Sequence, residues 1–268
     1  MNKDINYFNS LESFISSCNN DNSTYLLFVA EECSFDFSIL QKSNIKYYGA
    51  VFPEVIFENQ NYKSGLIAYK LPLDSEAIII QDMSSFSNTL TLLPGYTSII
   101  AIVDGLSPYI SSFLENLFES LDENSEIIGG GAGKLTLKQE PIIFNHDGIY
   151  EDSALLIGLK KDIHVGVKHG WNYLDGPFIE TNTDKNILKQ IDYKSAFEVY
   201  KEIVEKDSGL TFNKDNFFNI AKSYPLGIVK FNQEVIVRDP IVRDKDNLVL
   251  VGDLIENSII NILKGEKD

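Results

Sequence analysis

The segment from Ile127 to Lys134 constrains the fold more than any other, because it places four glycines in the five positions from 129 to 133. Glycine lets another group approach the main chain closely, but it weakens a strand unless something packs on the bare backbone. The run therefore predicts either a binding floor of exposed N–H groups or a tight crossing of two buried sheets. Under the first interpretation, the ligand-binding residues are Gly129, Gly130, Gly131, Ala132 and Gly133.

The glycine run does not match the known phosphate-binding loops. No Ser or Thr follows Lys134, and the spacing differs from that of a P-loop. A dinucleotide-binding fingerprint needs different glycine spacing and a long helix after it, and the sequence has neither. We therefore expect no nucleotide cofactor, and no other cofactor is indicated.

Charge and composition narrow the possible partners. The chain has 268 residues, enough for one large or two ordinary domains, and a net charge of −16. Without a basic stripe, nucleic acid is not an expected partner, and the acidic surface would be repelled by anionic membranes. Cys18 and Cys33 lack a metal or redox spacing, and no apolar run reaches transmembrane length. With a polar N-terminus lacking a signal core, the chain is expected to be cytoplasmic.

Apolar periodicity predicts strands that outnumber helices. Helices are expected at 8–18, at 34–41 with Ser34 as its cap, after Ser107-Pro108 with Pro108 in the first position, at 193–204 and at 217–221. Strands are expected at 25–30, 45–52, 55–57, 64–71, 76–81, 97–103, 127–133, 141–144, 154–159, 163–167, 225–228, 235–237, 248–251 and 259–263. A turn at 58–61 is expected to join the strands 55–57 and 64–71, and a charged hairpin turn is expected at 243–247.

The order of elements repeats within the first 160 residues. In each half a buried strand leads to a helix, a strand through small residues, a polar turn and an apolar strand. Residues 48–51 correspond to residues 130–133, and residues 59–61 to residues 145–148. We predict an α+β (mixed α/β) fold with layered, largely antiparallel sheets flanked by helices, built on a duplicated β-α-β-β unit. A cleft between two such units is a natural ligand site.

His169, Gly170 and Trp171 form the second candidate site. An imidazole titrates near neutral pH, and an indole stacks on ligands or cations. The alternative is a histidine at a strand end and a buried tryptophan that closes a core. His164 and His169 lie five residues apart without cysteines or paired carboxylates at ligand spacing, so no metal site is predicted.

Arg238 is the third candidate, because arginine can hold a ligand carboxylate with two hydrogen bonds. The alternative is an ion pair inside an acidic chain. Asp104 follows a buried strand, where polar site residues often lie, although a turn is the simpler explanation. The acidic neighbours of Cys33 should raise its pKa rather than activate it. No nucleophile elbow is present, so no catalytic residue is predicted.

Taken in order, several short motifs resemble the FIST family of sensory domains. They are residues 127–133, Phe144 to Gly148 with Asp152, His169-Gly170-Trp171, Ile191-Asp192 with Ala196 and Tyr200, Pro225-Leu226-Gly227, Val237-Arg238 and Gly252-Asp253. The resemblance implies a cytoplasmic small-molecule-binding sensor in signal transduction, with an amino acid or similar metabolite as ligand and a signalling protein as partner. A second copy of the chain is the partner expected if the chain is instead a scaffold. Lys134 replaces a usual acidic residue, and Gly49-Ala50-Val51 stands where the family has a GCS/T strand.

The resemblance also sets the expected domains. Residues 1–160 are the FIST N-like duplicated region, residues 161–222 continue it with the HGW segment and a helix, and residues 223–268 begin a truncated FIST C-like region. Two alternatives remain: a protein-interaction scaffold without a ligand, and a hydrolase or transferase that uses His169 as its base.

Overall fold

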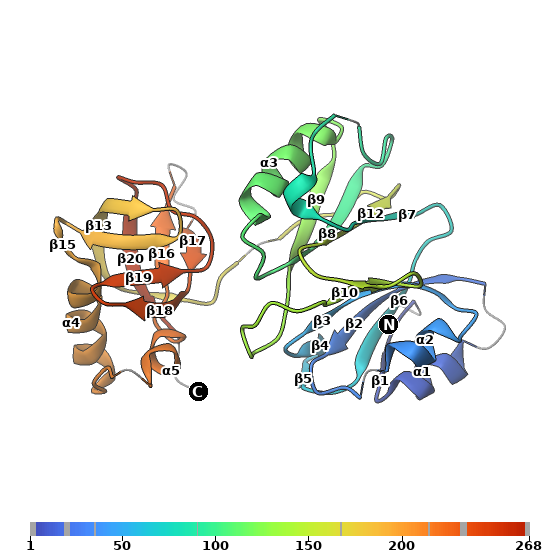
Figure 1. Cartoon of the computed structure of the whole chain (residues 1–268), viewed down its shortest axis with the longest axis horizontal. Coiled ribbons are helices and arrows are strands. Elements are labelled where there is room, and N and C mark those ends of the chain that lie inside the picture. The colour runs from blue at the N-terminus through green and yellow to red at the C-terminus, as the bar shows by residue number, and fades with distance from the viewer. Residues whose placement is uncertain are drawn as a thin grey trace. The chain divides into compact units, whose positions relative to one another are not determined.

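The chain folds into two compact units, residues 1–165 and 166–268 (Figure 1). The computed structural model describes residues 4–18, 22–34, 36–89, 91–166, 168–213, 215–230 and 235–265. Strands outnumber helices in both units, and most strand pairs are antiparallel. The predicted α+β class with layered sheets is therefore confirmed.

The first sheet of residues 1–165 has six strands and a single parallel pair. Their order is β1 (Ile5–Phe8), β6 (Leu66–Lys70), β2 (Thr24–Ala30), β3 (Lys46–Phe52), β10 (Ile143–Asn145) and β11 (Ile149–Tyr150). β2 and β3 run parallel, and every other neighbouring pair is antiparallel. The strand β10 arrives from much later in the chain and pairs with β3.

The second sheet has four strands, and β9 forms one of its edges. Their order is β7 (Glu76–Ile80), β12 (Ala154–Leu159), β8 (Ser98–Asp104) and β9 (Glu126–Ala132). β8 and β9 run parallel, whereas β12 is antiparallel to both β7 and β8. The order β12-β8-β9 therefore repeats the directions of β6-β2-β3 in the first sheet.

Successive side chains of β8 point to opposite faces of this sheet, so the two faces pack against different parts of the unit. Ile100 and Ile102 belong to the cluster shared with the first sheet, whereas Ile99, Ala101 and Val103 pack with the helix α3 (Ile110–Ser120). The helices α1 (Leu11–Ser17) and α2 (Phe37–Gln41) pack on the first sheet through Leu11, Phe14 and Leu40 (Figure 1). The unit is thus built as two sheets with helices on their outer faces.

Three predicted helix starts in residues 1–165 were wrong in detail. α1 begins at Leu11 after its cap Ser10, because Phe8 belongs to β1. α2 begins after Asp36, whose carboxylate accepts the N–H of Ser38 at 2.9 Å, so Asp36 rather than Ser34 is the cap. Pro108 precedes α3, whose N-cap is Tyr109 without a side-chain cap bond. The Ser107 hydroxyl instead accepts the N–H of Tyr109 at 3.2 Å, which uses it in the turn before the helix.

The segment after β3 also differs from the expected hairpin. β4 (Val55–Phe57) pairs with β5 (Gln60–Tyr62) in a separate two-stranded sheet, and β6 pairs with β1 and β2 instead. The turn is shorter than predicted because Glu58 takes a positive φ of 55°, which lets the chain reverse within two residues. A 3₁₀ turn, Met83–Ser85, follows β7.

Residues 166–268 form a sheet of eight strands. Along the main path the order is β17 (Val235–Arg238), β16 (Leu226–Val229), β20 (Ile259–Lys264), β13 (Asn172–Asp184), β14 (Ile187–Ile191), β19 (Asn247–Leu250) and β18 (Pro240–Asp244), and β15 (Lys194–Ser195) pairs with β14. Residues 163–166 form no strand, which corrects the prediction at 163–167, and Val167 lies outside the described residues. β18 and β19 form the predicted charged hairpin.

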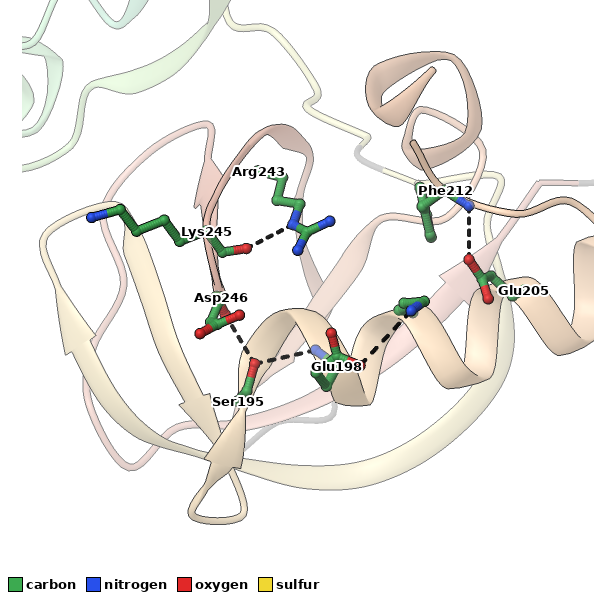
Figure 2. Close-up of polar contacts among 8 residues, drawn as sticks. Ser195, Glu198, Glu205, Phe212, Arg243, Lys245 and Asp246 are labelled. Atoms are coloured by element: carbon green, nitrogen blue, oxygen red, sulfur yellow. Dashed lines mark hydrogen bonds and ion pairs between the residues drawn. The ribbon is translucent and has the colours of Figure 1, made fainter. Parts of the chain in front are cut away.

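The helices of this unit are α4 (Ala196–Ser208) and α5 (Phe217–Ala221). α4 starts later than predicted, because Tyr193 has a positive φ of 63° and the chain first forms β15. Figure 2 shows how the start is fixed: the Ser195 hydroxyl accepts the N–H of Glu198 at 3.3 Å and donates to the carbonyl of Asp246 at 3.2 Å. The cap therefore ties the helix to the β18–β19 turn.

Candidate ligand-binding site

An apolar cleft of about 840 Å³ opens in residues 1–165 between the two sheets. The strand β9 and the inner face of β8 form one side, strands of the first sheet form another, and the β4–β5 hairpin borders it. Its lining is Ile5, Phe28, Phe52, Glu54, Val55, Ile56, Phe57, Glu58, Ile67, Ile100, Ile102, Ile128, Gly129 and Gly130. This volume is near the upper end of the range, about 300–1,000 Å³, that holds drug-sized ligands.

Because Gly130 has no side chain, it leaves the backbone of β9 uncovered at the floor of the cleft. The parallel register places Ile128 beside Ile100 and Gly130 beside Ile102, on the face that looks toward the first sheet. A Cβ built on Gly130 would meet no atom within 4 Å. A side chain at this position would therefore project into open space rather than into the protein.

Gly129 and Gly131 are required by packing instead. A Cβ on Gly129 would overlap the carbonyl oxygen of Ala101 on β8, and a Cβ on Gly131 would lie 2.9 Å from the Cα of Gly105. Close backbone packing within the sheet and its following loop thus accounts for Gly129 and Gly131, and the ligand-binding role of the glycine run stays a prediction. Only Gly129 and Gly130 of the predicted run line the cleft.

The end of the run has other contacts. Ala132 is buried, and the N–H of Gly133 donates to the carbonyl of Val51 at 2.9 Å. A Cβ on Gly133 would also meet open space, but this residue is not part of the cleft lining. Gly133 therefore offers a matched control for substitutions at Gly130.

The charge in the cleft lining comes from Glu54 and Glu58. Glu54 accepts a hydrogen bond from the amide of Asn61 and lies 3.9 Å from the ammonium of Lys63. No arginine, lysine or histidine belongs to the lining among the residues that the structure describes. The cleft is thus apolar with an anionic border, which favours apolar ligands that carry a cationic or neutral polar group.

Aromatic contacts hold the β4–β5 hairpin beside the cleft. The rings of Tyr7 and Tyr62 stack with centroids 4.1 Å apart, and Phe57 stacks on Tyr7 at 6.3 Å. Ile56, between Val55 and Phe57, is 71% exposed although it lines the cleft. Ile56 therefore adds exposed apolar surface to the border of the cleft.

The other predicted site residues lie in residues 166–268. Trp171 packs against Gly265, where an added Cβ would lie 3.1 Å from its ring. His169 has a buried Nδ1 without a hydrogen-bond partner in the described part of the chain. A Cβ built on Gly170 would meet no atom within 4 Å. These three residues therefore stay together in one unit, separate from the glycine run.

Arg238 lies at the end of β17. Its guanidinium donates to the carbonyls of Val237 at 3.2 Å and Asp253 at 3.5 Å. Burial lowers the pKa of Arg238, while the nearby carboxylates of Asp253, Glu180 and Asp239 oppose that change. This environment fits the internal charge interpretation, and the ligand-holding role stays a prediction.

Glu180 is the carboxylate that the sequence did not single out. Its side chain is fully buried at a bulge in β13, and both carboxyl oxygens lack a hydrogen-bond partner in the described residues. Burial raises the pKa of Glu180 to about 7, which the charge of Arg238 partly opposes. Glu180 is therefore protonated to a large extent at neutral pH.

Two other polar candidates have structural explanations. Asp104 accepts the N–H groups of Leu106 at 3.1 Å and Asp152 at 2.9 Å, and the amide of Gln139 at 3.3 Å. It therefore organises the loops at the end of β8. Burial is the main reason that the pKa of the Cys33 thiol is raised, with a smaller contribution from Glu12. A raised pKa leaves less of the reactive thiolate.

Most of the cleft lining was not predicted as a site, including Phe28, Phe52, Ile67, Ile100 and Ile102. These residues belong to segments that were predicted only as strands. The one signal of the cleft in the sequence was the short apolar segment Val55–Phe57 beside acidic residues. Such an apolar segment is unusual in an ordinary turn.

The strand order and the cleft define an α+β module with an apolar cavity at the edge of a sheet. The model of the FIST N domain family matches residues 20–194, well over half of the chain. The chain belongs to the FIST family, whose members are sensory domains of signal transduction. The matched range contains the whole cleft lining except Ile5 and ends within residues 166–268, at β15. A comparison with curated proteins gave no match.

No helix in the described ranges has both the length and the apolar character needed to cross a bilayer.

Proposed function

We propose that this chain is a cytoplasmic sensory domain that binds a small, predominantly apolar ligand in the cleft beside β9. The observation that carries the proposal is Gly130, which lies on the cleft side of β9 with no atom near the position of its missing side chain. A ligand in the cleft would cover Ile56 and Ile128, which are 71% and 40% exposed. Covering such surface is the main source of affinity for apolar ligands.

The ligand class follows from the lining. An amino acid with an aliphatic or aromatic side chain fits best, because its side chain suits the isoleucines and phenylalanines and its ammonium suits Glu54 and Glu58. Its carboxylate would need donors, and the edge of β9 offers backbone N–H groups. A purely anionic ligand is disfavoured by the same two glutamates.

Three further features are consistent with the proposal. Both cysteines are free and buried, as suits a reducing cytoplasm. The shared strand directions of β6-β2-β3 and β12-β8-β9 support an internal duplication of the unit. A sensory domain also needs an output, which we assign to a signalling protein partner or to a second copy of the chain.

Thermal unfolding of the whole chain in the presence of single amino acids and small apolar metabolites tests the proposal. A ligand at about 100 times its Kd should add about 2.7 kcal/mol of stability. Gly130→Leu should abolish the shift, because leucine would fill the cleft, and Gly133→Leu should leave it unchanged. A shift that survives Gly130→Leu, or the absence of any shift, would contradict the proposed site.

Alanine substitutions separate the cleft from the second candidate. If His169 and Trp171 belong to the site, replacing both with alanine should weaken binding measured by calorimetry. Unchanged affinity would remove these two residues from the site and leave the cleft residues as its determinants.

A further inference from the structure

The two sheets of residues 1–165 differ in what lies beside their corresponding strands β3 and β9, and the cleft opens beside β9. In the first sheet the order β6-β2-β3 continues with β10, which pairs antiparallel with β3 and places Phe144 opposite Gly49. In the second sheet the order β12-β8-β9 ends at β9, and no strand of the described residues lies beyond it. A strand beside β9 would complete the same four-strand pattern.

The β4–β5 hairpin does not pair with β9. The hairpin after β9, formed by β10 and β11, joins the edge of the opposite sheet at β3. The hairpin after β3, formed by β4 and β5, pairs only within itself, although Val55, Ile56 and Phe57 border the same cleft as β9. The cleft is therefore the space that remains between this hairpin and an edge strand.

An edge strand beside an apolar cleft exposes both unpaired backbone groups and apolar side chains. Alternate backbone N–H and C=O groups of an edge strand point away from the sheet and are free to pair with another strand. The isoleucines and phenylalanines of the cleft meanwhile offer apolar surface to side chains. One ligand that satisfies both is an extended peptide, which pairs through its backbone and inserts alternate side chains.

We propose that the ligand of the cleft is an extended peptide segment of a partner protein, added to the second sheet as a strand beside β9. This inference rests on the proposed placement of the ligand site in the cleft. It replaces the free amino acid by a peptide that brings the same apolar side chains and cationic groups to the lining. The side chains of the segment that face the first sheet are aliphatic or aromatic, to match the isoleucines and phenylalanines of the cleft lining. Glu54 and Glu58 in the lining, and Glu126 at the start of β9, select lysine or arginine at the ends of the segment.

Synthetic peptides provide the first test. The probe is a positional library of capped seven-residue peptides, matched to the seven residues of β9, with lysine at both ends and variable positions between. Binding to the whole chain is followed by fluorescence anisotropy, with a glutamate-ended library as the comparison. We expect lysine-ended peptides with alternating apolar residues to bind, and no preference over the glutamate-ended library would overturn the inference.

N-methylation distinguishes strand addition from simple occupation of the cleft. Only alternate amides of an added strand pair with β9, so methylating one alternate set should reduce affinity by at least about tenfold and methylating the other set should not. Gly130→Leu should abolish peptide binding, whereas Gly133→Leu should preserve it. Equal effects of the two methylation sets would overturn strand addition.

The outcomes separate this inference from the proposed function. Binding of free amino acids without binding of peptides would refute the peptide ligand and leave the small-ligand site standing. Failure of both, with a folded chain, would refute both. If sedimentation shows a dimer that Gly130→Leu dissociates and peptides do not displace, the strand beside β9 comes from a second copy, and the partner-peptide proposal is wrong.

Discussion

The ring of Phe144 lies directly on the backbone of Gly49, so that a Cβ at Gly49 would come within 2.5 Å of the Cζ atom of Phe144. The two residues are opposite each other in the antiparallel pair of β10 and β3. A Cβ at Gly49 would also lie 2.6 Å from the carbonyl oxygen of Leu27. Glycine at position 49 is therefore required by two neighbours at once.

Gly49→Ala should destabilise the protein by about 1–3 kcal/mol, the usual penalty for overpacking a buried site. Gly130→Ala is the matched substitution at an open position and should leave the free energy of unfolding unchanged or raise it by about 0.4–1 kcal/mol, because alanine restricts the unfolded chain. Urea denaturation measures both. Equal losses for the two variants would show that Gly130 is as crowded as Gly49.

Tyr200→Phe should lower the free energy of unfolding by about 1–2 kcal/mol. The buried hydroxyl of Tyr200 donates to the carbonyl of Tyr224 at 2.7 Å, and its removal leaves that carbonyl without this donor. Tyr193→Phe is the control, since Tyr193 is 83% exposed and should tolerate the change. The difference between the two midpoints in urea gives the contribution of the buried bond.

Ser195→Ala should destabilise the protein by about 0.5–2 kcal/mol, the range measured for lost helix caps. The substitution removes the hydroxyl that accepts from Glu198 and donates to Asp246 (Figure 2). Ser195→Thr keeps a hydroxyl and should retain most of the stability. If the alanine and threonine variants unfold at the same urea concentration, the cap contributes nothing measurable.

Glu180 should make the protein less stable as the pH rises. The pKa of Glu180 is raised from 4.5 in the unfolded chain to about 7 in the folded protein, so between these values the folded state holds the proton more tightly. Its contribution is fully present below pH 4.5 and is lost as the pH approaches about 7, for a total of about 3 kcal/mol.

Glu180→Gln isolates this effect, because glutamine cannot ionise. The difference in unfolding free energy between Glu180→Gln and the parent chain should grow in favour of glutamine from pH 5 to pH 8. Urea titrations at several pH values measure it. Parallel pH profiles for the two proteins would mean that Glu180 is ionised without penalty in the folded state.

Much of the secondary structure was predictable because local patterns specify it. Apolar runs bounded by polar turns identified β2, β3, β8 and β12 within a residue or two. Three of the predictions that failed depended on single residues that the pattern does not reveal. Asp36 rather than Ser34 caps α2, and the positive φ values of Glu58 and Tyr193 shift a turn and a helix start.

Only part of the candidate site could be predicted from the sequence. The glycine run marked β9 as the strand that borders the cleft. Side chains alternate between the two faces of a strand, however, and the sequence does not say which face of β9 borders the cleft. That choice depends on the register of β9 against β8, which puts Gly130 beside Ile102 and Gly129 beside Ala101. The apolar lining comes from strands separated by up to 125 residues, as from Ile5 to Gly130.

The sequence by itself determined that strands would dominate, that the chain would be acidic, and that a bare backbone would lie at residues 129–133. These properties follow from composition and from periodicity along a few neighbouring residues. Only the tertiary structure decided that β10 completes the first sheet while β9 remains an edge, and that Gly130 faces a cleft while Gly129 and Gly131 face protein atoms. The reason is physical: strand pairing and packing join distant segments, and their geometry depends on all the contacts of the folded chain together.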